Sequence, residues 1–276
     1  MAITEQELIF IALEDIEKLQ HFVTTASYGI EISIGAIHDL DLLKQTESVL
    51  GTPGKYLSDD AYKKRIVLLE PIRDFAIREQ LEDFPFLYGT VTVRLWSIIE
   101  NTVDELVLSA LTLRNIQSET IDELTGPLLP FLNSSRAEQA AYLAAELKTK
   151  LKADFKPGVA RFECLLNCVE LGGPVDDEVR KALLELSEVR HVLVHRSGTA
   201  DKKILKDRCP WLPFEIGEEI RVTEEAFNAY CEACVWYIFE LFCRIIPHDD
   251  EKIVAFREKQ ASDLAKLKAR KRYERT

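Results

Sequence analysis

The sequence predicts an all-α protein built around a helical bundle. Glycine and proline are scarce, at 11 and 10 of the 276 residues, which argues against a turn-rich all-β protein. Long segments repeat apolar residues at intervals of three and four, the spacing of an amphipathic helix. Hydrophobic residues make up 47% of the chain, which is enough for a sizeable core. We therefore expect a bundle with additional helices before it.

Two helical segments and a loop are expected near the N-terminus. Residues 4–26 place apolar side chains near one face, and Thr4 is a candidate N-cap. Residues 35–50 form a second amphipathic segment. It should end at Gly51-Thr52-Pro53-Gly54, because glycine and proline favour turns.

Two shorter helical pieces should lead into the core helix. Residues 59–69 favour a helix, and Pro71 should begin a new piece that runs to about Glu82, because proline fits the first helical turn. Residues 86–114, after Pro85, are the most apolar long segment and should lie at the centre of the core. The apolar residues at helical spacing in it are Trp96, Ile99, Val103, Leu106 and Ala110.

The C-terminal half adds helices that are separated by Gly, Pro and capping residues. Asp176 or Asp177 should cap one helix, and Thr223 should begin another. Residues 212–222 allow a small two-stranded β-ribbon with a turn at Gly217. The expected helices are 135–152, 160–171, 177–196, 224–246 and a charged C-terminal helix at 249–273 that extends from the body.

These elements suggest three regions. Residues 1–84 are an N-terminal helical region, residues 85–246 a helical bundle, and residues 247–276 hold the charged C-terminal helix. No Gly-rich linker separates them, although residues 115–135 could form a seam because prolines interrupt them.

Charge and cysteine content narrow the class of protein. There are 35 Lys and Arg against 47 Asp and Glu, a net charge of -12, which speaks against a surface that binds nucleic acid everywhere. We expect no membrane span and no signal peptide. The cysteines lie among apolar residues and are expected to be reduced core thiols of a cytoplasmic protein. They are Cys164, Cys168, Cys209, Cys231, Cys234 and Cys243.

Common catalytic motifs are absent from the sequence, including GxGxxG, GxxxxGK[ST], GxSxG and HExxH. Cys164-x3-Cys168 and Cys231-x2-Cys234 raise the alternative of a four-cysteine zinc site. Both pairs lie in apolar helical segments, whereas structural zinc sites usually draw such pairs from turns, so core thiols are favoured.

The most informative segment is 185–198, with the sequence ELSEVRHVLVHRSG. Val179, Leu186, Val189 and Leu193 form its apolar stripe, which the polar residues flank: these are Arg190, His191 and His195. His191 and His195 share a face, and Glu188 lies one turn earlier. From spacing alone, this set could bind a metal through Glu188 and both histidines, or form an ordinary ion-pair network on a solvated face.

A third interpretation rests on a resemblance. Arg190-His191-Val-Leu-Val-His195 resembles the signature of HEPN domains, an Arg and a polar residue followed by a His four to six residues after the Arg. The wider string LLELSEVRHVLVHRSGTAD, with CPWL after it, is similar to bacterial members, and LWSIIENTVDELV at 95–107 is similar to their first core helix. The resemblance covers about residues 85–246.

The resemblance implies a bundle of four or five helices, commonly a homodimer, that is often a metal-independent ribonuclease and sometimes a toxin or phage-defence effector. One branch of HEPN toxins has a tyrosine two residues after the signature His, which a partner enzyme modifies. Ser197 stands there in this chain, so control through that tyrosine is not supported.

The implied chemistry assigns roles to individual residues. His195 would act as general acid and base, Arg190 would stabilise the phosphate, and His191 would orient them. Five residues along a helix turn the chain by about 140° beyond a full circle. Arg190 and His195 therefore diverge on one helix, and a two-fold dimer is expected to combine two copies of each. The substrate-binding residues are expected to be Glu188, Arg196, Lys202 and Lys203.

The expected partners are an RNA substrate, a second copy of the chain and an antitoxin or other partner protein, with no membrane, metal or cofactor. The basic run that contains Lys206 and Arg208 could line an RNA cleft or be an ordinary solvated loop. The main alternative function is a catalytically silent HEPN binding or scaffold module with residues 1–84 as its partner surface. A weaker one is a helical regulatory protein in which the match is accidental.

Overall fold

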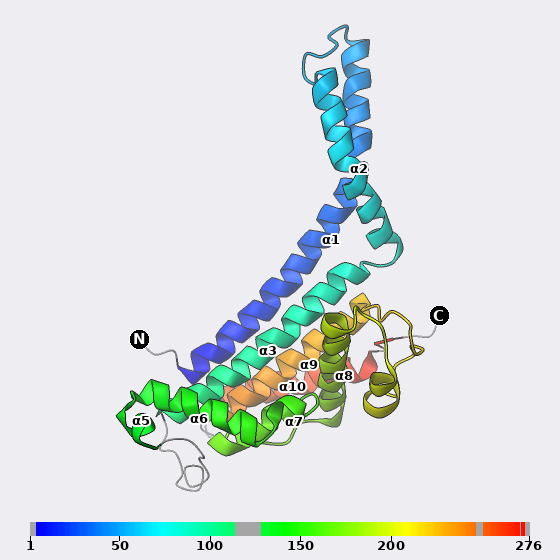
Figure 1. Ribbon diagram of the computed structural model, residues 1–276. Helices are drawn as coiled ribbons and strands as arrows, with labels where there is room; N and C mark the ends of the chain where they lie inside the picture. Colours follow the sequence, from blue (N-terminus) through cyan, green and yellow to red (C-terminus); the bar gives the residue numbers. More distant parts are fainter. Residues whose placement is uncertain (1–3, 114–127, 247–250, 271, 274–276) are drawn as a thin grey trace. The chain divides into compact units, whose positions relative to one another are not determined.

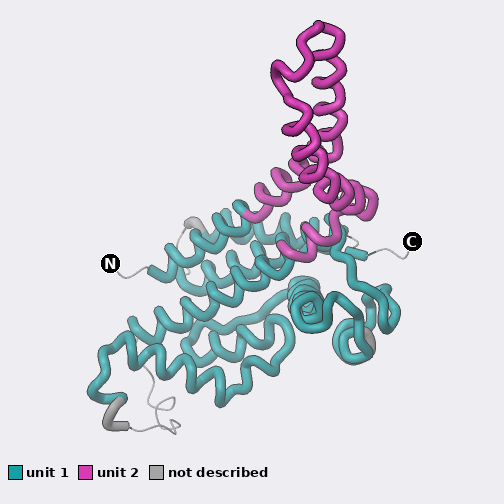
Figure 2. Tube along the Cα trace, turned by 45° about the horizontal axis from the view of Figure 1, so that its top comes forward, with its two compact units in different colours: residues 1–18, 92–276 teal, residues 19–91 magenta. Residues whose placement is uncertain are grey.

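The computed structural model describes residues 4–113, 128–246, 251–270, 272 and 273. Helices form nearly all of the regular structure in these residues, and no strand occurs among them (Figure 1). The all-α prediction is confirmed. The chain divides into two compact units, residues 19–91 and residues 1–18 together with 92–276 (Figure 2), which are described separately.

The first long helix, α1 (Glu5–Val49), continues without a break. The expected interruption between residues 26 and 35 is therefore wrong. That interval contains no proline, and its Gly29 and Gly35 each cost only about 1 kcal/mol relative to alanine, which does not end a helix. The part of α1 after residue 18 belongs to the 19–91 unit.

Helix α2 (Asp59–Leu81) completes a hairpin with α1, and Ser58 caps its first turn. Pro71 lies inside α2, so the expectation that it begins a new helix is wrong. Pro71 cannot donate to the carbonyl of Val67 one turn earlier. Val67 is 72% exposed, so water can take the place of that donor.

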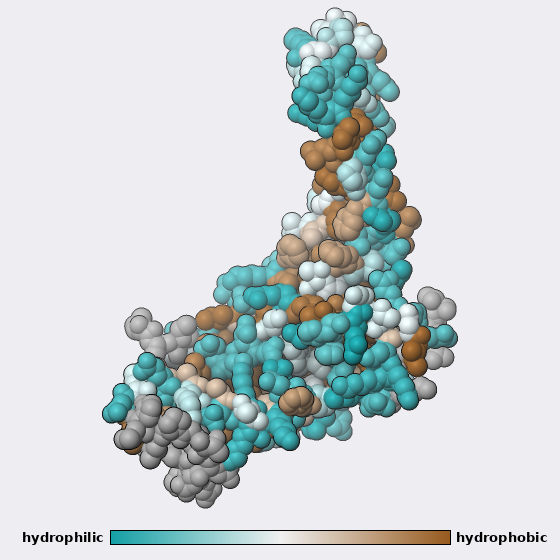
Figure 3. All heavy atoms as spheres, viewed as in Figure 1, coloured by the Kyte–Doolittle hydropathy of each residue, from teal (hydrophilic) through white to brown (hydrophobic). Residues whose placement is uncertain are grey.

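The loop between α1 and α2 is held by one carboxylate. Buried Glu47 accepts from the backbone N–H groups of Gly54, Tyr56 and Leu57 at 3.2, 2.5 and 2.9 Å. These bonds, led by that from Tyr56, lower the pKa of Glu47. The predicted loop at residues 51–54 is confirmed. Elsewhere the hairpin leaves much apolar surface exposed, which is visible as brown atoms in Figure 3.

The larger unit contains the remaining helices and most of the buried residues. Helix α3 (Pro85–Leu113) enters it from the smaller unit. The other α-helices are α5 (Leu128–Asn133), α6 (Arg136–Lys150), α7 (Ala160–Leu166), α8 (Asp177–His195), α9 (Glu224–Ile245) and α10 (Glu251–Ala269). Shorter turns are η1 (Ala153–Phe155), η2 (Asn167–Val169) and the π-helical η3 (Lys203–Arg208).

The core forms where α3, α7 and α9 meet. Trp96 stacks on Phe162 with ring centroids 5.0 Å apart, and Phe162 stacks on Tyr237 at 6.1 Å. The predicted core residues of α3 are all buried, namely Trp96, Ile99, Val103, Leu106 and Ala110. Asp176 and Thr223 cap α8 and α9 as expected.

The charged helix α10 does not extend from the body. Phe256 packs against Phe239 and Phe242 of α9 at 5.3 and 4.9 Å, and Gln260 and Leu267 are buried. The expectation failed because these few apolar residues give only a weak stripe in the sequence, but they are enough to dock the helix. No helix in the described residues is long and apolar enough to cross a membrane.

The β-ribbon expected within residues 212–222 does not form. A single antiparallel bridge joins Thr199 to Glu219, and the N–H of Ile220 donates to the carbonyl of Gly198 at 2.8 Å. Gly217 does make a turn, with φ of +91°. Residues 218–220 therefore pair with the segment that follows α8, which is distant in sequence.

Candidate functional site

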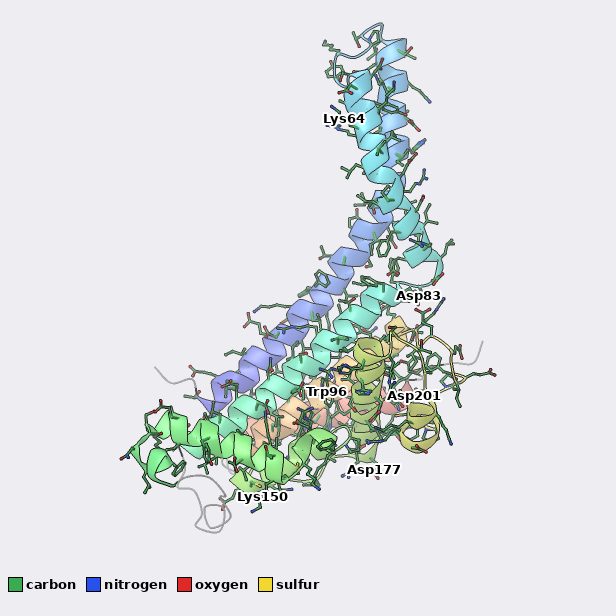
Figure 4. The ribbon with its side chains drawn as sticks, in the orientation of Figure 1. Lys64, Asp83, Trp96, Lys150, Asp177 and Asp201 are labelled. Atoms are coloured by element: carbon green, nitrogen blue, oxygen red, sulfur yellow. The ribbon has the colours of Figure 1, made fainter. Side chains whose placement is uncertain are left out.

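The candidate site lies at the C-terminal end of α8. Asp176 accepts from the N–H of Glu178 at 2.9 Å and fixes where the helix begins. Figure 4 labels Asp177 in the first turn and Asp201 beyond the last. The apolar stripe of α8 is buried in the chain's own core by Val179, Ala182, Leu183, Leu186, Val189 and Val192. Leu193, an expected member of this stripe, is only half-buried.

His191 and His195 are exposed and adjacent. Their ring centroids lie 5.0 Å apart with an angle of 53° between the ring planes. They occupy the last turn of α8, because the chain leaves the helix at Arg196 and then adopts left-handed backbone at Ser197 and Gly198. This places two imidazoles side by side where a ligand can approach them.

Several charged groups surround His191. Partial desolvation of the His191 ring lowers its pKa, and the neighbouring His195 lowers it further, with smaller effects from Lys203 and Arg196. The carboxylate of Glu188 acts in the opposite direction. The neutral imidazole of His191 is therefore favoured. The ion pair between Arg208 of η3 and Glu188 of α8, at 3.3 Å, shows that these two elements lie close together.

Arg190 occupies a different side of α8. Helix geometry puts it about 100° from His191 and about 140° from His195. Its side chain is half-buried, and its Nε is buried with no hydrogen-bond partner in the described part of the chain. The structure thus brings the two histidines together but does not bring Arg190 into the same cluster within one chain.

The expected substrate-binding residues have different environments. Glu188 is 13% exposed and accepts from Nη1 of Arg208 at 3.3 Å. Arg196 lies 3.9 Å from Asp201, a long contact between two partly exposed groups. Lys202 and Lys203 are exposed. The side chain of Lys206 lies outside the described residues.

One buried cluster next to the site could not be found from the sequence. Glu185, one turn before Glu188, is 1% exposed. It accepts from Nε of Arg272 at 2.6 Å and from Nε1 of Trp211. The only signals in the sequence are a carboxylate at a core position of α8 and an arginine near the C-terminus, and neither indicates that the two meet.

The zinc alternative finds no support in the described residues. No group of three or more His, Cys, Asp or Glu side chains in them could hold a metal ion. All six cysteines are free, and burial raises the pKa of each thiol. Cys164 and Cys168 are half-buried, whereas the other four are fully buried as expected of core thiols.

Comparison with known proteins does not assign the chain to a family. No family model matches it, and neither a curated protein nor a solved structure matches it. Function must therefore be inferred from the chemistry of α8 and its surroundings.

Proposed function

We propose that this chain is a metal-independent endoribonuclease of HEPN type that acts in the cytoplasm. The observation that carries the proposal is the pair of exposed imidazoles of His191 and His195, 5.0 Å apart at the end of α8. The positive charges of Arg196 and Lys203 act on His191 and would attract a phosphate. The resemblance of residues 190–195 to the HEPN signature supplies the reaction class.

The proposed reaction uses the 2′-hydroxyl of the substrate as the nucleophile. His191, with its lowered pKa, accepts the proton of the 2′-hydroxyl, whose oxygen bonds to phosphorus. The bond from phosphorus to the 5′-oxygen breaks, and His195 in its protonated form donates a proton to that oxygen. The products are a 2′,3′-cyclic phosphate and a 5′-hydroxyl. This assignment gives His191 a direct role in addition to orientation.

The position of Arg190 favours a homodimer. Because Arg190 points about 140° away from His195, a second copy would bring its own Arg190 to the phosphate. Val189 is completely buried within its own chain and offers no surface for contact. At this end of α8, Val194 is 47% exposed and Leu193 is half-buried, so both leave apolar surface for a second copy. Light scattering at micromolar concentration tests this arrangement, and a mass of 31.5 kDa would contradict it.

The exposure of His191 and His195 favours cleavage over a silent scaffold. A scaffold does not need two neighbouring exposed imidazoles, and its function would tolerate their burial. A growth-limiting effector role, as in toxins or phage defence, would also require a partner such as an antitoxin to restrain the activity. The effector role and the restraining partner are therefore inferred only if the protein cleaves RNA.

The test is incubation of the purified protein with total RNA in EDTA. We expect cleavage by the wild-type protein, and a loss of about 100-fold or more in His195→Ala and in Arg190→Ala. His38→Ala is the matched control, since His38 is an exposed histidine of the other unit. Uncleaved RNA with the wild-type protein would favour the scaffold function. Activity that is lost in EDTA and restored by Zn²⁺ or Mn²⁺ would favour a metal-dependent reaction.

A further inference from the structure

Trp211 is an exposed tryptophan in the segment between η3 and α9. Its side chain is 41% exposed, whereas Trp96 and Trp236 are 3% and 8% exposed. Large aromatic rings are usually buried, since their transfer from water is favourable. An indole that stays partly in solvent beside a candidate RNA site is a candidate binding surface.

The structure holds this ring firmly against α8. Nε1 of Trp211 donates to Oε1 of Glu185, and the ammonium of Lys181 lies 5.0 Å from the ring centroid. Glu185 is itself fixed by Arg272, whose Nη2 donates to Oε1 at 3.1 Å. An anchored ring loses little conformational entropy when a ligand stacks on it.

Lys181, whose ammonium lies over the Trp211 ring, and His195 share one side of α8. Lys181, Glu188 and His195 follow one another at spacings of seven, which keeps them within about 40° of one another around the helix, whereas His191 lies about 120° from Glu185. The helix rises 1.5 Å per residue, so Glu185 lies about 9 Å before His191 and about 15 Å before His195 along the axis. At 3.4 Å per stacked nucleotide, these two distances correspond to roughly three and four nucleotides.

The charges between these points do not oppose a nucleic acid strand. The carboxylate of Glu188 is paired with Arg208, and that of Glu185 with Arg272. Lys181 adds an ammonium beside the indole. A phosphate backbone that follows this side of α8 would therefore meet paired carboxylates and several cations.

We propose that Trp211 is a stacking platform for an unpaired base of the RNA, a few nucleotides from the bond that is cleaved. The proposal rests on the proposed ribonuclease function and names single-stranded RNA as its substrate class. Bases inside an A-form duplex are stacked on one another, whereas unpaired bases are free to stack on aromatic side chains. Stacking of this kind tolerates any base, because every base has a π-face.

The fluorescence of Trp211 provides a direct test. A short 2′-O-methyl oligoadenylate, which cannot be cleaved through its 2′-oxygen, is titrated into the full-length protein. Tryptophan emission and the anisotropy of a labelled copy of the oligonucleotide are recorded together. We expect emission to be quenched in parallel with binding. A blunt RNA duplex should not quench it.

Two substitutions isolate the aromatic face. Trp211→Phe and Trp211→Ala both remove the N–H that donates to Glu185, so the difference between them reports the ring. We expect Trp211→Ala to bind the oligonucleotide about tenfold more weakly and Trp211→Phe to recover most of the affinity without the quenching. Trp236→Phe, which alters a buried tryptophan, should leave the affinity for the oligonucleotide and the quenching on binding unchanged. Helix content by circular dichroism confirms that each variant is folded.

The outcomes separate this proposal from the ribonuclease itself. Quenching without cleavage of ordinary RNA would support the platform and contradict the ribonuclease. Cleavage with equal oligonucleotide affinity in Trp211→Ala and wild type would overturn the platform and leave the ribonuclease standing. Quenching that persists in Trp211→Phe, or no binding of the oligonucleotide at all, would also overturn the platform.

Discussion

Replacing Arg190 with methionine should separate stability from activity. The Nε of Arg190 is buried, and no described residue accepts a hydrogen bond from it. Methionine keeps an unbranched apolar stem of similar length, so packing along α8 is largely retained. The substitution removes both the unpaired donor and the charge that the proposed reaction requires.

The magnitude follows from the cost of an unpaired buried donor. Such a group destabilises a folded protein by about 1–3 kcal/mol. Removing the unpaired donor should recover this free energy. Part of it is lost again because the methionine side chain is shorter than arginine and packs less completely, so we expect Arg190→Met to be about 1 kcal/mol more stable than wild type. For a chain of this size, that difference raises Tm by about 2–4 °C. RNA cleavage should fall by about 100-fold or more, since a charged group that stabilises the transition state is gone.

The assay combines thermal unfolding with RNA cleavage on the same preparations. Arg208→Met is the matched control, because Arg208 pairs with Glu188, which is 13% exposed. Removing this partner leaves a carboxylate without its cation, so the control should unfold at a lower temperature than wild type.

A fall in Tm of several degrees for Arg190→Met would refute the reasoning, because it would mean that the guanidinium has a stabilising partner in the folded protein. Unchanged cleavage would remove Arg190 from the proposed reaction.

His195→Ala should shift Tm by only a few degrees while cleavage is lost, since the side chain is exposed. Trp96→Ala, which empties a buried site, should lower the free energy of unfolding in urea by about 3–5 kcal/mol. If His195→Ala destabilises the protein as much as Trp96→Ala does, His195 is a core residue. Arg272→Ala should cost about 3–5 kcal/mol, because it leaves the carboxylate of Glu185 buried without its cation, and urea unfolding unchanged from wild type would disprove this. Because the pKa of His191 is lowered, its neutral form persists to lower pH, so the acid limb of kcat/KM should have its midpoint below 6.5, the ordinary pKa of histidine; a midpoint above 6.5 would exclude His191 as the base.

Helix caps and the core helix could be predicted because they depend on nearby residues. Asp176 and Thr223 satisfy N–H groups two and three residues further on, and this requirement is visible in the sequence. The apolar spacing around Trp96 predicted the buried face of α3 for the same reason, since residues three and four apart share one side of a helix.

Glycine and proline were less reliable as predictors of helix ends, because the free energy that each costs inside a helix is small or can be offset. Gly29 and Gly35 do not interrupt α1, and Pro71 lies inside α2. Each such residue costs about 1–3 kcal/mol, which packing and hydration elsewhere in the helix can outweigh. The sequence shows the penalty but not the compensation.

The surroundings of the candidate site depend on contacts between distant residues. Sequence alone placed His191 and His195 on one face of a helix capped by Asp176 or Asp177, and the structure has them side by side with Asp176 as the cap. It could not show that Arg272, 87 residues further along, would pair with Glu185. It also could not show that residues 218–220 would pair with 198–200, or that Trp211 would stay exposed beside α8. Helical spacing is set by the backbone within four residues, whereas the partner of a buried charge is set by which segments the whole core brings together.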